Sequence, residues 1–66
     1  MTGTVKWFDD ARGYGFIQAD DTNEDIFVHY SGIVMEGHKS LPENVRVKFN
    51  IKNTQKGKCA VDVVLI

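Results

Sequence analysis

The clearest pattern in the chain is a strict alternation of apolar and polar residues over residues 45–51. The apolar positions are Val45, Val47, Phe49 and Ile51. A period of two is typical of a β-strand with one face in the core and the other in solvent. The last segment, Cys59–Ile66, has the same period, and its apolar positions of one parity are Val61, Val63 and Leu65. The pattern therefore predicts two half-buried strands in the second half of the chain.

Three more strands are predicted in the first half of the chain. They cover Thr2–Phe8, Tyr14–Ala19 and Ile26–Tyr30, which are rich in β-branched and aromatic residues. The expected inward residues are Val5, Ile17, Ile26 and Val28. Trp7 shares the parity of Val5, but the adjacent Trp7 and Phe8 cannot both face the same way. This conflict indicates a β-bulge near them.

Residues 12–17 have aromatic side chains where a strand of a soluble protein usually has polar ones. Tyr14 and Phe16 share one face of this strand, beside Arg12, and Ile17 is the better candidate for the interior. Both rings are therefore predicted to face outward, as are Phe27 and His29 on the next strand. Glycines at 13 and 15 are typical of a sharp bend of the sheet or of the close approach of another backbone.

Polar turns are predicted at 9–13, 20–25 and 53–58, and a longer connection at 31–43. In this connection, Ser31 is expected to cap a short helical turn, Ile33 and Leu41 to reach the core, and Pro42 to exclude a central strand. Five strands without a long helix bury a core best when the sheet closes on itself, which also removes exposed edges. We therefore predict an all-β fold, a five-stranded antiparallel β-barrel of the oligonucleotide/oligosaccharide-binding type.

Length and composition narrow the possible functions. The 66 residues suffice for a single domain, 1–66, and their net charge is -1. This charge does not indicate a protein held to nucleic acid mainly by bulk electrostatics. The single cysteine, Cys59, forms neither an intramolecular disulfide nor a paired-cysteine zinc site. No signal peptide and no apolar run of about 20 residues is visible, so we expect a cytoplasmic protein without a membrane segment.

Six of the seven aromatic residues lie in the first half of the chain, on the three predicted strands there. The alternative that they form the core is weaker, because the aliphatic residues already fill so small an interior. Outward rings on a sheet hold successive bases by stacking with little demand on sequence. Lys6, Arg12 and Lys56 are expected to meet phosphates beside them. The residues thus predict a site for single-stranded nucleic acid, without metal or cofactor.

Three stretches resemble the bacterial cold-shock proteins over nearly the whole chain. They are Lys6-Trp7-Phe8, Gly13-Tyr14-Gly15-Phe16-Ile17 and Ile26-Phe27-Val28-His29-Tyr30, of which the latter two resemble the ribonucleoprotein-type motifs of that family. The resemblance implies a five-stranded barrel that binds single-stranded DNA and RNA. It also implies an RNA chaperone that melts secondary structure in transcripts and affects transcription or translation, often in cold adaptation.

The predicted nucleic-acid-binding residues combine both arguments. They are Lys6, Trp7, Phe8, Asp9, Arg12, Tyr14, Phe16, Phe27, His29, Tyr30, His38, Lys39 and Lys56. Three of them depart from the family pattern: Asp9 replaces an Asn, Arg12 a Lys and His38 a Phe. Asp9 is expected still to accept from a base edge but to repel phosphate, and His38 to stack over less area. Lys58 adds a positive charge at the rim.

Other functions are less consistent with these residues. His29 lacks a catalytic partner, since Asp25 is four residues, or about 13 Å, away along a strand. Cys59 is more typical of a small core residue, and the acidic 20–25 turn lacks the spacing of a calcium loop. We therefore expect no enzyme. The main alternative is a protein- or oligosaccharide-interaction module on the same barrel, although the cations favour a polyanion. A monomer is expected, with strand exchange about the 31–43 connection left open.

Overall fold

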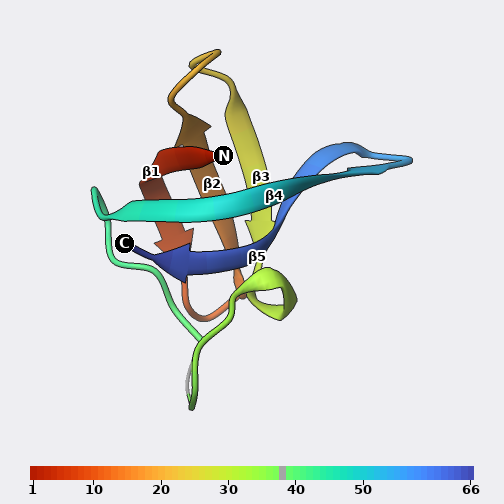
Figure 1. The fold of residues 1–66 in the computed structure, drawn as a ribbon. Coiled ribbons are helices and arrows are strands. Elements are labelled where there is room, and N and C mark those ends of the chain that lie inside the picture. The colour runs from red at the N-terminus through yellow and green to blue at the C-terminus, as the bar shows by residue number, and fades with distance from the viewer. Residues whose placement is uncertain (38) are drawn as a thin grey trace.

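Five strands close into a barrel in the computed structural model of this protein, which describes residues 1–37 and 39–66 (Figure 1). The strands are β1 (Thr2–Asp9), β2 (Tyr14–Ala19), β3 (Asp25–His29), β4 (Arg46–Thr54) and β5 (Gly57–Leu65), and a short 3₁₀ helix, η1 (Tyr30–Gly32), follows β3. All five strands match a predicted segment. The largest difference is that β4 and β5 run further toward each other than predicted, and their hairpin projects from the barrel in Figure 1.

One strand pairing differs from the prediction. The strands follow one another around the barrel in the order β1-β2-β3-β5-β4, and four of the five pairings are antiparallel. The fifth, between β3 and β5, is parallel and pairs Phe27 with Cys59 and Val28 with Ala60. The prediction of a wholly antiparallel barrel was wrong for a topological reason. An odd number of strands cannot alternate in direction around a closed ring, so at least one neighbouring pair must be parallel.

Among the residues that the structure describes, the core is aliphatic except for the ring of Phe49. Its buried residues are Val5, Ile17, Ala19, Ile26, Val28, Ile33, Leu41, Val47, Phe49, Ala60 and Val63. The predicted inward residues of β1, β2 and β3 are confirmed, as are the two anchors from the long connection. Ile51 is only half-buried and packs against this cluster. Because aliphatic residues fill the interior, the remaining aromatic residues are available for the surface.

Two bulges break the period of two. The predicted one is confirmed in β1, where the register shifts between Val5 and Trp7 and leaves Lys6 as the extra residue. The other lies in β5 at Asp62, which has a positive φ of 54° and lies where the β4–β5 register shifts. As a result the buried residues of β5, Ala60 and Val63, are three apart. The shared parity of Val61, Val63 and Leu65 therefore does not give them one inward face: Val63 is buried, as predicted, but Leu65 is 50% exposed.

An ion pair away from the aromatic residues ties the β2–β3 turn to β4. Arg46 donates two hydrogen bonds to the Asp20 carboxylate, at 2.7 and 2.6 Å, and the Thr2 hydroxyl donates a third at 2.6 Å. The hydrogen bonds from Arg46 and Thr2 hold the pKa of Asp20 well below its ordinary value of 3.8. Among the described residues, the helical part of the chain is too short to cross a membrane.

Candidate nucleic-acid interface

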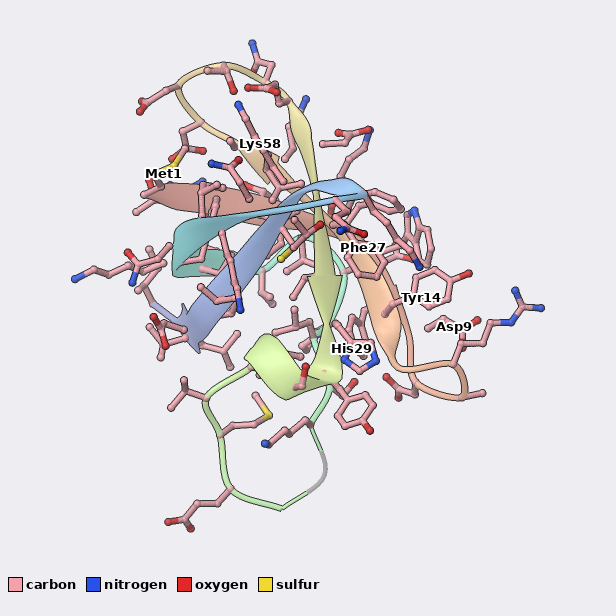
Figure 2. The ribbon with its side chains drawn as sticks, turned by 90° about the vertical axis from the view of Figure 1, so that its right-hand side faces the viewer. Met1, Asp9, Tyr14, Phe27, His29 and Lys58 are labelled. Atoms are coloured by element: carbon pink, nitrogen blue, oxygen red, sulfur yellow. The ribbon has the colours of Figure 1, made fainter. Side chains whose placement is uncertain are left out.

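Four aromatic rings from three neighbouring strands gather on one side of the barrel. We call this set, Trp7 of β1, Tyr14 and Phe16 of β2 and Phe27 of β3, the aromatic platform. Figure 2 shows Tyr14 and Phe27 beside each other on this side, with His29 and Asp9 near Tyr14. Neighbouring ring centroids are 5.5 to 5.9 Å apart. Trp7 is 39% exposed and the other three residues are half-buried, so the platform is accessible to solvent.

Strand register brings these rings together. Trp7 pairs with Phe16 and Phe16 pairs with Phe27, so the three residues form one row across β1, β2 and β3. Paired residues of a sheet project to the same side, and the opposite side of these strands is filled by core residues such as Ile17. The bulge at Lys6 is required for this row, because without it Trp7 would follow Val5 into the barrel.

The row continues beyond the predicted residues. Phe27 pairs with Cys59 of β5, and Cys59 pairs with Lys52 of β4. Cys59 is half-buried and has a free thiol. It was expected to be a core residue, but it lines the same hollow as Phe16 and Phe27. The sequence could not reveal this position, since it depends on the parallel pairing of β3 with β5.

Gly15 provides space for the platform. A Cβ on Gly15 would lie 2.7 Å from the Cα of Phe8 on the facing strand, so only a glycine permits the close approach of β1 and β2. The predicted close approach of another backbone is therefore found here. Phe8 pairs with Gly15 and packs partly against the core, so it does not belong to the ring contacts of the platform.

Gly13 was predicted, like Gly15, to lie at a sharp bend of the sheet, but its role in the structure is different. It lies in the β1–β2 turn, outside the strands, with a φ of +77°. A Cβ there would lie 2.5 Å from Cδ2 of Tyr30. The Tyr30 amide also donates a hydrogen bond to the Gly13 carbonyl, at 2.8 Å. The turn and the Tyr30 ring therefore fix each other.

Tyr30 does not belong to the third strand, contrary to the prediction. β3 ends at His29, and Tyr30, which is 49% exposed, begins η1. The centroids of the Tyr30 and His29 rings are 4.3 Å apart. His29, and not Ser31 as predicted, is the N-cap of η1. Its Nδ1 accepts a hydrogen bond from the Ser31 amide at 3.3 Å and lies 2.9 Å from the Ser31 hydroxyl. The neutral ring therefore carries its proton on Nε2.

The Asp9 carboxylate contacts the β1–β2 turn that follows it. Its Oδ1 accepts hydrogen bonds from the amides of Ala11 (3.0 Å) and Arg12 (3.1 Å), and its Oδ2 lies 3.8 Å from Nε of Arg12. A hydrogen bond with the Tyr14 side chain, together with the Asp9 carboxylate, raises the pKa of Arg12. Asp9 thus stabilises the turn through Oδ1 and holds a cation at the edge of the platform through Oδ2.

A hollow lies at each end of the platform. One, of about 450 Å³, is lined by the Tyr30 ring together with Arg12 and Lys39. The other, of about 650 Å³, lies between the platform and the β4–β5 hairpin, and its lining includes Phe16, Phe27, Lys56 and Lys58. Of the predicted cations, Arg12, Lys39 and Lys56 line these hollows, and Lys6 pairs with Asp25, which lines the larger one. His38 lies outside the described residues, so its predicted stacking role stays a prediction.

Comparison with known proteins agrees with this geometry. A family model described as the "'Cold-shock' DNA-binding domain" matches residues 1–66. The chain belongs to the cold-shock domain family. It is 46% identical to "Cold shock-like protein CspA" of Vibrio cholerae over 66 residues, covering 100% of this chain and 94% of the relative. It is 52% identical to "Cold shock protein" of Arthrobacter globiformis over 64 residues, covering 97% and 96% of the two chains.

A relative from Escherichia coli (strain K12) has a similar degree of identity. "Cold shock-like protein CspE" of that organism is 45% identical over 66 residues, covering 100% of this chain and 96% of the relative. Membership of the cold-shock domain family makes nucleic acid the ligand class of this chain.

Proposed function

We propose that the aromatic platform binds single-stranded DNA and RNA by base stacking and that the protein acts as an RNA chaperone. In this role it melts secondary structure in transcripts and modulates transcription or translation, in cold adaptation. The observation that carries the proposal is the set of four exposed or half-buried rings from three strands. Its setting is the cytoplasm, where an unpaired thiol such as Cys59 stays reduced. The binding unit is a monomer.

Ring spacing supports melting as well as binding. Bases stacked on each other in a nucleic-acid helix are about 3.4 Å apart. The ring centroids of the platform are 5.5 to 5.9 Å apart. Bases seated on neighbouring rings are therefore too far apart to stack on each other as in a helix. A strand bound in this way is held unstacked and unpaired, which opposes the re-formation of hairpins.

The expected free energies indicate that stacking contributes more to binding than phosphate contacts do. Stacking contributes about 1–3 kcal/mol per base, so three or four bases contribute roughly 3–12 kcal/mol before the cost of association. Three or four phosphate contacts give a log–log salt slope of only about -2 to -3 for a single strand. Because the net charge is -1, bulk electrostatics adds no attraction. Binding is therefore expected to survive moderate salt.

Trp7 offers a direct test, because its indole is part of the platform. Titration with oligothymidylate is expected to quench Trp7 fluorescence, while an oligosaccharide of similar size leaves it unchanged. A fluorophore-quencher hairpin RNA is expected to open on addition of the protein. Quenching by the oligosaccharide alone would favour the interaction-module alternative. Quenching by oligothymidylate without opening of the hairpin would retain single-strand binding and exclude the chaperone activity.

A further inference from the structure

We propose that Asp9, Glu24 and Asp25 act as internal competitors for phosphate, so that the platform selects its ligands by exposed bases and not by phosphate charge. This inference rests on the proposed function and concerns the selectivity of the same site. It assigns to these three carboxylates, which we call the rim carboxylates, a role in rejecting polyanions whose bases are hidden.

Each rim carboxylate is paired with a cation at the edge of the platform. Asp25 Oδ2 lies 3.3 Å from Nζ of Lys6, and Glu24 Oε1 lies 3.3 Å from Nζ of Lys58. Asp9 forms the third pair, with Arg12. Asp25 and Glu24 line the larger hollow beside Phe16 and Phe27. These pairs therefore lie at both ends of the platform, in the positions that a bound phosphate backbone would approach.

Charges around the platform nearly cancel as a result. The cations there are Lys6, Arg12, Lys39, Lys56 and Lys58, and the carboxylates are Asp9, Asp10, Glu24 and Asp25. A phosphate that reaches Lys6 comes within a few ångströms of Asp25, well inside the Debye length of about 8 Å at physiological salt. The attraction of the cation and the repulsion of the carboxylate then largely offset each other.

Weak ion pairs suit this role. All three pairs are solvent-accessible, with side chains between 38% and 71% exposed. Exposed pairs of this kind contribute little to stability. They leave the cations able to exchange partners when stacking brings a backbone close. A duplex offers phosphates without accessible base faces, so it gains little here, whereas a single strand gains the stacking energy.

Isosteric amides test the inference without removing a hydrogen-bond acceptor. The variants are D9N, E24Q and D25N, singly and combined. In D9N the side-chain carbonyl oxygen can still accept the hydrogen bonds from the amides of Ala11 and Arg12. Binding of oligothymidylate and of a DNA duplex is measured from 50 mM to 500 mM salt. The oligothymidylate slope is expected to steepen by about 0.7 for each cation released, and so by about 2 in total in the triple variant. At 50 mM salt the triple variant is expected to bind duplex at least about tenfold tighter than wild type.

The matched control for each single variant is E43Q, which removes one negative charge as they do. Glu43 lies in the connection before β4, outside the three ion pairs. Its variant is expected to keep the wild-type slope and duplex affinity. Equal slopes and duplex affinities in wild type, E43Q and the triple variant would overturn the inference. If the triple variant does not fold, E24Q and D25N alone decide it by the same slopes. Failure of wild type to bind oligothymidylate at all would instead refute the proposed function.

Discussion

The ring of Tyr30 covers Gly13, with Cδ2 2.5 Å from the position that a Gly13 Cβ would take. The Gly13 carbonyl accepts a hydrogen bond from the amide of the same tyrosine. This relationship joins the β1–β2 turn to η1, two segments that carry predicted ligand contacts at one end of the platform. Gly13 therefore matters for the position of Tyr30 as well as for the turn.

Gly13→Ala is expected to destabilise the protein by about 2–4 kcal/mol, because the added methyl group meets both a left-handed backbone and the Tyr30 ring. Gly37→Ala is the matched control. Gly37 has a similar φ of +73° but no atom within 4 Å of its Cβ position, so only the backbone cost of about 1 kcal/mol applies. Urea unfolding of both variants measures the difference. Equal losses would show that the ring contact contributes nothing.

Phe27→Ala is expected to weaken oligothymidylate binding by about 5- to 150-fold, the equivalent of 1–3 kcal/mol for one lost stacking partner. Phe16→Ala is expected to behave alike, since the two rings are 5.9 Å apart in one row. Leu65→Ala, at an exposed apolar side chain of β5, serves as the control. Trp7 quenching measures all three affinities, and circular dichroism verifies the fold. A loss in Leu65→Ala as large as in Phe27→Ala would argue against stacking on the platform.

Acid is expected to destabilise the protein partly through Asp20. Its pKa is lower in the folded state than its ordinary value of 3.8, so the unfolded chain takes up the proton first as the pH falls. The stabilisation is complete above about pH 5 and is lost below about pH 4 as the pH falls through the folded-state pKa. Asp20→Asn is expected to show a smaller fall in Tm between about pH 5 and pH 2.

The control for this experiment is Asp21→Asn, at the neighbouring carboxylate, which makes none of these contacts with Arg46 and Thr2. It is expected to follow the wild-type pH profile. Identical profiles for wild type and Asp20→Asn would mean that the ion pair with Arg46 does not stabilise the folded state.

Substitutions at Asp62 test the bulge in β5. The residue has a left-handed backbone and accepts a hydrogen bond from the Asn50 side chain at 3.0 Å. Asp62→Ala is expected to lose about 1–2 kcal/mol of stability, since alanine tolerates this conformation poorly. Asp62→Gly, which also lacks the carboxylate, is expected to be the more stable of the two because glycine adopts a positive φ without strain. Thermal unfolding ranks them, and the reverse order would contradict the backbone explanation.

Period-two patterns were sufficient to predict the five strands and most of the core. They failed at Asp62, because residues 60–65 are apolar on both parities and only the single aspartate marks the bulge. The end of β3 was also not predictable from the pattern. Tyr30 continues the strand pattern in the sequence, and the cap that ends the strand is the side chain of His29, a residue not usually associated with capping.

Among the site residues, those whose position follows from alternation were the easiest to predict. The outward direction of Tyr14, Phe16 and Phe27 follows from the aliphatic residues beside them. The ion pairs at the rim were not predictable, because Lys6 and Asp25 are 19 residues apart and Lys58 and Glu24 are 34 apart. Such pairs depend on strand register and loop geometry. Cys59 was misplaced for the same reason, since its position depends on a pairing that closes the barrel.

That closing pairing has a consequence for how the barrel forms. The parallel seam between β3 and β5 has only two residue pairs, and it joins Phe27 to Cys59 far along the chain. Loop closure over such a separation costs entropy before any contact rewards it, while the β1–β2 and β4–β5 hairpins need only local closure. We therefore expect the hairpins to form early, and the two long-range pairings, β1 with β4 and β3 with β5, to form after them. Because Phe27 belongs to the platform and Cys59 to the hollow beside it, the larger hollow is completed only when the barrel closes.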